Sequence, residues 1–216
     1  PGPLPAGMKA AVTAAERGHK VVLFDAAPEI GGQFNLAKRI PGKEEFAETI
    51  RYFGARLAKL GVEVRLGRHV ECADLGNFHH VIVATGIVPR TLDVPGIGHP
   101  KVASYADIVS GRRVAGSKVA IIGAGGIGFD VAELLTASSP HDGHASDGHV
   151  DDPAIAQFRE EWGIDADFAE RGGLGEVREP APARHVWLLQ RKPSKVGEGL
   201  AKTTGWIKRT LLKKRG

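Results

Sequence analysis

Hydrophobic residues make up 42% and charged residues 25% of this 216-residue chain, and its formal net charge is +4. These values are typical of a soluble globular protein with one large or two small domains. No apolar run is long enough to cross a membrane, no leader peptide is recognisable, and the single cysteine, Cys72, excludes a disulfide framework. We therefore expect a cytoplasmic protein that does not associate with membranes.

The first half of the chain predicts helices and strands in alternation. An alanine-rich helix is expected to end at Gly18, and apolar residues recur at helical spacing from Phe46 to Leu60. Three apolar stretches are typical of strands: 20–25, 62–66 and 80–86. We expect the third strand to be buried. A doubly wound nucleotide-binding fold has another strand before its first helix, and the chain starts too late to contain it.

The second half repeats this order after residues 89–117, a segment rich in turn formers that we expect to connect two domains. An apolar strand begins at Lys118 and runs through a glycine-rich turn into a helix. An insertion at about 137–184 is expected to separate this helix from the next strand. A short helix, the second strand and a final helix are predicted at 155–162, 185–190 and 205–212.

These elements predict an α/β fold class with two tandem Rossmann-like nucleotide-binding units, each built on a parallel sheet. The first unit is expected at 1–88 and the second at 118–216. We expect both units to be incomplete at the chain ends, because neither contains enough strands to finish a sheet.

The turn from 123 to 128 has the spacing G-x-G-x-x-G and lies between a strand and a helix, which is the context of a dinucleotide site. Gly123 permits the tight turn, Gly125 lets the backbone approach a pyrophosphate, and Gly128 lets the helix pack close to the strand. The phosphates would meet free N–H groups at the helix N-terminus. The alternative is a glycine-rich turn that binds nothing.

Asp25 ends the strand predicted at 20–25. A carboxylate at this place accepts hydrogen bonds from the ribose hydroxyls of an adenosine, and a solvated strand-end aspartate is the alternative. The glycine turn before it keeps Gly2 and Gly7 but has Leu4 in its middle position. Because a leucine side chain there would crowd a pyrophosphate, we expect either a non-native N-terminus or poor binding at this first site.

Arg191 and Lys192 follow the strand predicted at 185–190, where an NAD site has a carboxylate. Two cations suit the 2′-phosphate of NADPH, and arginine can bind it bidentately. This pattern favours NADPH over NADH. The usual gap between the glycine motif and this position is about 20 residues, so the insertion has to be assumed, and a basic surface turn is the alternative.

Two other charged segments carry less specific patterns. His141, His144 and His149, with the aspartates around them, have no compact zinc-ligand spacing, and we expect no metal site. The basic end at 208–215 has apolar residues on one side, so a solvated helix with a basic face is expected rather than a nucleic-acid interface. No nucleophile–base pair or pair of carboxylates suited to acid–base catalysis is recognisable, so no catalytic side chain is assigned.

Several longer segments lie partly outside the phosphate loops and are more specific than a glycine motif: 29–38, 40–46, 84–90, 123–130 and 202–207. They resemble the NADPH-dependent 2,4-dienoyl-CoA reductases of bacteria. The likeness covers nearly the whole chain and is weakest over 138–152. It implies an oxidoreductase that passes hydride from NADPH to FAD for the reduction of unsaturated fatty acyl-CoA, as in fatty acid β-oxidation.

The resemblance also implies what this chain would and would not contain. In the family an N-terminal barrel carries FMN, an iron–sulfur cluster and the acyl-CoA site, and this chain resembles only the FAD- and NADPH-binding part, so it is expected to be a fragment. Its direct partners would be small-molecule nucleotides. Two alternatives stay open: another NADPH-linked flavoprotein, such as a glutamate synthase small-subunit relative, and a non-catalytic nucleotide-binding fragment.

The resemblance further assigns cofactor contacts to individual residues. Ala6 and Gly7 would contact the pyrophosphate of FAD, and Gly32 and Gln33 would contact its phosphate–ribityl region. Val70 would meet the adenine through its backbone, and Thr85 and Gly86 would line the crossing between the two domains. Asp25 would hold the adenosine ribose. For NADPH, Gly126 joins the other three glycines at the pyrophosphate, and Arg191 and Lys192 would bind the 2′-phosphate.

Overall fold

The computed structural model forms two compact units, Pro1–Val102 and Ala103–Gly216. The residues that it describes are 5–90, 92–137, 153–179 and 181–215. The boundary between the units falls inside the segment 89–117, and the domain limits given above stay a prediction. No helix among the described residues is long and apolar enough to cross a membrane.

The first unit combines helices with a short parallel sheet. Its elements in chain order are α1 (Pro5–Glu16), β1 (Val22–Phe24), α2 (Phe34–Ala37), α3 (Phe46–Lys59), β2 (Glu63–Arg65) and the 3₁₀ turn η1 (Cys72–Leu75). Strands β1 and β2 pair in parallel, with Leu23 opposite Val64. Parallel strands need a long crossover, and α3 supplies it. The helices and strands predicted around 46–60, 20–25 and 62–66 are therefore confirmed.

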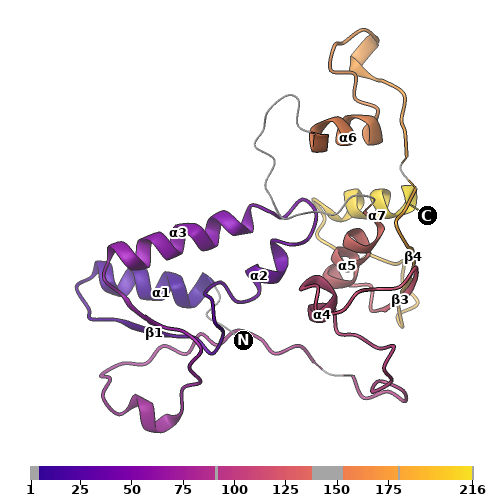
Figure 1. Cartoon of the computed structure of the whole chain (residues 1–216). Coiled ribbons are helices and arrows are strands. Elements are labelled where there is room, and N and C mark those ends of the chain that lie inside the picture. Colours follow the sequence, from indigo (N-terminus) through magenta and orange to yellow (C-terminus); the bar gives the residue numbers. More distant parts are fainter. Residues whose placement is uncertain (1–4, 91, 138–152, 180, 216) are drawn as a thin grey trace. The chain divides into compact units, whose positions relative to one another are not determined.

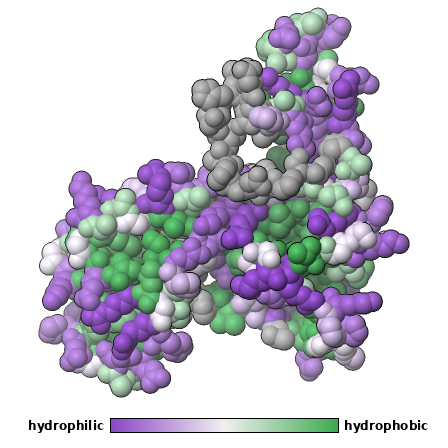
Figure 2. Space-filling view, in the orientation of Figure 1, coloured by the Kyte–Doolittle hydropathy of each residue, from purple (hydrophilic) through white to green (hydrophobic). Residues whose placement is uncertain are grey.

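The core of the first unit lies where α1, α3 and β1 meet. Figure 1 shows α1 and α3 side by side, with β1 running beneath them. Met8 and Val12 from α1, Leu57 from α3 and Leu23 from β1 are buried together. Apolar side chains also reach the surface over these two helices (Figure 2). Burial of these aliphatic side chains supplies most of the stabilisation of such a small unit.

The prediction of a buried strand at 80–86 is wrong. These residues form neither helix nor strand, and the side chains of Ile82 and Val83 are 67% and 79% exposed. A strand exists through backbone hydrogen bonds to a neighbour, and among the described residues of this unit only β1 and β2 pair. Apolar composition therefore indicated a strand that has no partner within the described structure.

The second unit has the same order of strand, helix and strand. Its elements are α4 (Tyr105–Val109), β3 (Lys118–Ile122), α5 (Gly126–Thr136), α6 (Pro153–Trp162), η2 (Arg171–Gly173), β4 (His185–Leu189) and α7 (Gly205–Lys214). Strands β3 and β4 pair in parallel from Lys118 opposite His185 to Ile122 opposite Leu189. The α/β class with parallel sheets is confirmed in both units.

Helix α5 is the centre of the second unit and lies against β3, β4, α4 and α7 (Figure 1). Phe129, Ala132 and Leu135 are buried on it. At its C-terminal end, Nη1 of Arg184 lies 3.4 Å from the carbonyl oxygen of Leu135. A guanidinium at this end satisfies a carbonyl that the helix leaves unpaired, and its charge suits the helix dipole. The C-terminal end of α5 is thus tied to the segment that leads into β4.

Candidate nucleotide-binding sites

The glycine turn of the second unit joins β3 to α5 in the geometry that the motif predicts. Gly123 has φ +120°, a conformation that favours glycine, and its N–H donates to the carbonyl oxygen of Leu189 at 2.9 Å. Gly125 is the N-cap of α5 in an extended conformation and makes no side-chain capping bond. The turn therefore leaves the sheet beside the end of β4 and enters the helix within a few residues.

Gly128 is the position in this turn where a side chain has no room. A Cβ atom there would lie 1.9 Å from the carbonyl oxygen of Gly123 and 3.4 Å from the side chain of Leu188. By contrast, a Cβ on Gly125 or Gly126 would meet nothing within 4 Å. The helix consequently packs tightly on its own turn, while the outer side of the turn is open.

This turn fits a nucleotide diphosphate. The first N–H groups of a helix have no partner within it, and the first bond inside α5 runs from the N–H of Phe129 to the carbonyl oxygen of Gly125 at 3.0 Å. The open space at Gly125 and Gly126 lets a phosphate approach those N–H groups closely. Gly123, Gly125, Gly126 and Gly128 could therefore hold the diphosphate of a nicotinamide coenzyme.

Arg191 and Lys192 follow β4 at the same edge of the sheet, and both are exposed. The side chain of Gln190 holds the turn that carries them: its Nε2 donates to the carbonyl oxygens of Lys192 and Ser194 at 3.0 and 2.7 Å. Because carboxyl ends of parallel strands meet at one edge, the two cations lie on the side where the glycine turn opens. The ordering by Gln190 was not expected, since a glutamine at a strand end carries no specific signal.

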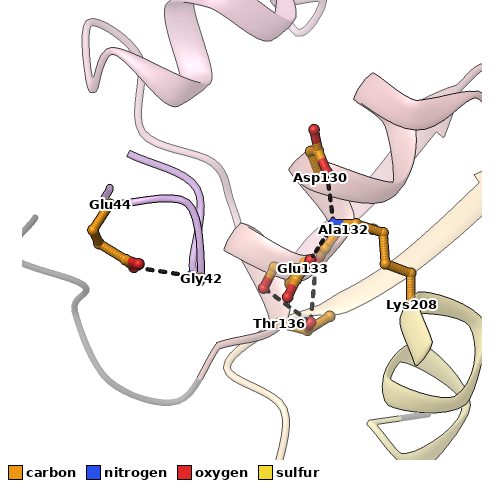
Figure 3. A network of polar contacts seen from close by, with 7 residues as sticks. All are labelled: Gly42, Glu44, Asp130, Ala132, Glu133, Thr136 and Lys208. Carbon is orange, nitrogen blue, oxygen red and sulfur yellow. Dashed lines mark hydrogen bonds and ion pairs between the residues drawn. The ribbon is translucent and has the colours of Figure 1, made fainter. Parts of the chain in front are cut away.

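A second feature that the sequence did not reveal is an ion cluster between α5 and α7. The ammonium of Lys208 lies 2.7 Å from a carboxylate oxygen of Asp130 and 2.8 Å from one of Glu133 (Figure 3). Burial disfavours the charged ammonium, but the hydrogen bonds to both carboxylates outweigh it and raise the pKa of Lys208. The residues are 78 and 75 positions apart in sequence, so no local pattern could indicate the contact.

Asp25 of the first unit is a buried carboxylate. The residue is 3% exposed; its Oδ1 accepts from the N–H of Ala27 at 2.8 Å, and its Oδ2 has no hydrogen-bond partner among the residues that the structure describes. Burial raises the pKa of Asp25 and outweighs the hydrogen bond from Ala27, which lowers it. An unpaired buried carboxylate oxygen is costly, and a pair of ribose hydroxyls would satisfy it. Asp25 therefore fits the adenosine of FAD.

The raised pKa of Asp25 predicts a stability gain from Asp25→Asn in the absence of FAD. The folded chain binds the proton more readily than the unfolded chain, so ionisation costs folding free energy as the pH rises above the ordinary value of 3.8. We expect Asp25→Asn to stabilise the chain by about 1 kcal/mol at neutral pH, and the gain should vanish below the ordinary pKa. Urea unfolding at several pH values measures it.

Asp74→Asn is a control for that measurement, because its effect on the free energy of unfolding is expected to have the opposite sign. The N–H of Glu71 and the guanidinium of Arg68 donate to its carboxylate and hold its pKa below the ordinary value. Its stabilising contribution is present at neutral pH and is lost as the pH falls, so Asp74→Asn should destabilise at neutral pH and not in acid. A gain from Asp25→Asn that persisted unchanged in acid would contradict the assignment to burial of the charge.

Four of the other predicted FAD contacts of the first unit lie in two places. Ala6 is exposed and Gly7 buried in the first turns of α1, and Gly32 and Gln33 are half-buried just before α2. The loop ahead of α2 is held by a bond from Nδ2 of Asn35 to the carbonyl oxygen of Ile30 at 2.8 Å. Gly2 and Leu4 of the first glycine turn lie outside the described residues.

Val70, Thr85 and Gly86 are not gathered around Asp25 by regular structure. Val70 is half-buried in the irregular segment before η1, and Thr85 and Gly86 are exposed in the segment that we expected as a strand. Their assignment to FAD stays a prediction.

The remaining ionisable patterns do not form a second site in the described part of the chain. The histidines at 141, 144 and 149 lie outside the described residues, and elsewhere no three potential metal ligands gather. Within the basic end, Arg209 donates to the carbonyl oxygen of Gly197 at 2.9 Å, and Arg215 pairs with Glu161 at 3.1 Å. Much of this basic segment therefore serves internal contacts.

Comparisons with known proteins identify a family and several relatives of this chain. The family described as pyridine nucleotide-disulphide oxidoreductase matches residues 2–142. An N,N-dimethylglycine/sarcosine dehydrogenase of Chromohalobacter salexigens is 40% identical over 125 residues, which are 54% of this chain and 18% of that protein. A metal reductase of Desulforamulus reducens is 34% identical over 63% of this chain and 21% of its own length.

A solved structure shares the fold as well. The chain of a 2-naphthoyl-CoA reductase complex superposes with a TM-score of 0.59 at 33% identity, over 62% of this chain and 21% of that one. This chain therefore spans about a fifth of the length of the relatives that it matches. Its single cysteine, Cys72, is exposed, so the chain has no dithiol pair of its own despite the family's name. Together, the matched residues and the two parallel αβ units show that this chain belongs to the pyridine nucleotide-disulphide oxidoreductase family.

Proposed function

We propose that the first unit binds FAD, that the second binds NADPH rather than NADH, and that the chain transfers hydride between them as part of a 2,4-dienoyl-CoA reductase. One observation carries the proposal: the glycine turn after β3 has free space on its outer side, and Arg191 and Lys192 follow β4, the strand that pairs with β3. On the inner side of the turn, helix α5 packs tightly at Gly128. The turn suits a diphosphate that both coenzymes have. The two cations suit the additional phosphate of NADPH.

The two cofactors, when bound, would supply the hydride-transfer chemistry. The residues of this chain bind and orient. Gly123 and Gly128 shape the turn, the N–H groups at the start of α5 hold the diphosphate, and Asp25 holds the ribose. The lack of a recognisable acid or base in the sequence is compatible with this division of labour.

The acyl-CoA substrate is the more distant part of the proposal. It rests on the segments that resemble the dienoyl-CoA reductases and is supported by the likeness to a 2-naphthoyl-CoA reductase. Other relatives carry names of dehydrogenases and of a metal reductase. Reduction of an unsaturated fatty acyl-CoA is therefore proposed for a longer protein of which this chain would supply the nucleotide sites.

A non-catalytic nucleotide-binding chain is the second candidate function. The exposed segment at 80–86 favours it, since Thr85 and Gly86 would have to line a flavin and lie instead in irregular backbone. Such a chain would bind NADPH through the second unit and would retain no FAD.

Anaerobic flavin reduction separates the two candidates. We expect the purified chain, after incubation with FAD and gel filtration, to keep the flavin's visible absorbance and to lose it on addition of NADPH. NADH should bleach the flavin more slowly at equal concentration. A colourless protein that still binds NADPH would establish the non-catalytic candidate, and a protein that binds neither nucleotide would overturn both.

A further inference from the structure

The loop that carries Arg191 and Lys192 is fixed at both of its ends. It begins where β4 ends and runs to Gly197, which is buried and has φ +77°. A Cβ atom at Gly197 would lie 2.7 Å from Cζ of Phe129, a buried side chain of α5. The guanidinium of Arg209 on α7 donates to the carbonyl oxygen of Gly197 at 2.9 Å. The far end of the loop is therefore tied to the core of the second unit.

The half-buried side chain of Gln190 folds the first half of this loop back on itself. Its Nε2 donates to the carbonyl oxygens of Lys192 and Ser194 at 3.0 and 2.7 Å, and the hydroxyl of Ser194 lies 3.3 Å from the same nitrogen. A carbonyl oxygen only accepts hydrogen bonds, so the nitrogen of the amide, and not its oxygen, has to face this pair. The two N–H bonds of one amide thus serve two carbonyls of the loop.

A proline restricts the same stretch of backbone. Pro193 lies between the two bonded carbonyls; its ring fixes its own φ and disfavours helical backbone at Lys192. Arg191 and Lys192 are thus attached to backbone that is ordered before any ligand arrives, while both residues stay exposed. An ordered pair of cations binds an anion more tightly than a flexible pair, because the loss of backbone entropy takes place during folding instead of binding.

We propose that Gln190 is a positioning residue for coenzyme selectivity: its amide holds the loop so that the cations of Arg191 and Lys192 are ordered to bind the 2′-phosphate of NADPH. The inference rests on the proposed preference of this chain for NADPH. It adds that the preference depends on the order of the loop as well as on its two charges. Gln190 acts through the backbone of the loop, without touching the coenzyme.

Gln190→Met keeps the length of the side chain and removes both donors without adding a charge. We expect it to weaken NADPH binding by about tenfold, because fixing the backbone of about one residue during binding costs that much affinity. NADH binding should stay within about twofold, since NADH has no 2′-phosphate for the loop to hold. Gln190→Asn, whose amide is one methylene shorter and cannot reach both carbonyl oxygens, should give an intermediate loss with NADPH.

A double-mutant cycle separates positioning from general damage to the second unit. In a chain that already carries Arg191→Ala and Lys192→Ala, the loop has lost the two cations that Gln190 would position. We therefore expect Gln190→Met to change the NADPH affinity of that chain by less than about twofold. Damage that reached the glycine turn would instead weaken both coenzymes, with or without the two cations.

The experiment is a set of dissociation constants for the full chain, measured by calorimetry with NADPH and with NADH at one ionic strength. Thr210→Val is the matched control, because it also removes a side-chain bond to a backbone carbonyl oxygen of the second unit, that of Trp206 at 2.9 Å. It should leave the ratio of the two constants unchanged. Thermal unfolding shows whether each variant folds, and Gln190→Asn decides the question if Gln190→Met does not.

A failure of this inference is distinguishable from a failure of the proposed function. If the unchanged chain binds neither coenzyme, or binds NADPH no more tightly than NADH, both are overturned. If it prefers NADPH and a folded Gln190 variant keeps that preference, only the role of Gln190 is overturned. An equal loss of both coenzymes, or a loss that persists without Arg191 and Lys192, also overturns that role. A loss confined to NADPH that disappears without the two cations supports it.

Discussion

Replacement of both Arg191 and Lys192 by alanine is expected to weaken NADPH binding by about a hundredfold and to leave NADH within about twofold. Hydrogen bonds to charged groups contribute about 1.5–3 kcal/mol each, and two cations face a phosphate with nearly two negative charges. NADH has an uncharged hydroxyl in place of this phosphate. The side chain of Gln190 holds the turn from the other side, so the loss of two neighbouring side chains should not displace its backbone.

Dissociation constants for the two coenzymes, measured at the same ionic strength, test this selectivity. Lys118→Ala is the matched control, because Lys118 is an exposed cation at the opposite end of β3. It changes the net charge in the same direction and should leave the ratio of the two constants unchanged. Equal losses of NADPH and NADH affinity in the Arg191 and Lys192 variant would show that these residues bind no 2′-phosphate.

Gly128→Ala is expected to abolish coenzyme binding and to destabilise the second unit by about 3 kcal/mol, at the upper end of the cost of overpacking. The added Cβ would stand 1.9 Å from the carbonyl oxygen of Gly123, so either the helix or the turn has to move. Any such movement tilts the N–H groups at the start of α5 away from a phosphate. The destabilisation arises without coenzyme, which distinguishes it from the loss of a contact.

Gly126→Ala is the matched control, because a Cβ at Gly126 meets nothing within 4 Å. We expect its free energy of unfolding to stay within about 1 kcal/mol of the original value, since alanine is a better helix former than glycine. Urea unfolding with a probe in the second unit, such as the fluorescence of Trp187, compares the two variants. If Gly128→Ala unfolds at the same urea concentration as Gly126→Ala, the close approach at Gly128 is not a real constraint.

Local patterns predicted most of the regular structure and the glycine site. Helix α3 follows from apolar residues at helical spacing, and the pair of β3 and α5 follows from an apolar run that meets a glycine turn. These features depend on residues close in sequence. The segment at 80–86 was predicted wrongly for the same reason: its composition is that of a strand, but a strand also needs a partner, and composition does not report one.

The order of residues alone was enough to specify two αβ units, the turn at Gly123–Gly128 and the cations at Arg191 and Lys192, because each depends on chemistry within a few positions of the chain. Tertiary structure decided the rest. Packing between distant segments decides whether the Asp25 carboxylate is solvated or buried. It also decides that Lys208 meets Asp130 and Glu133 across two helices. Desolvation and Coulomb interactions are set by those distances in space, and spacing along the chain does not contain them.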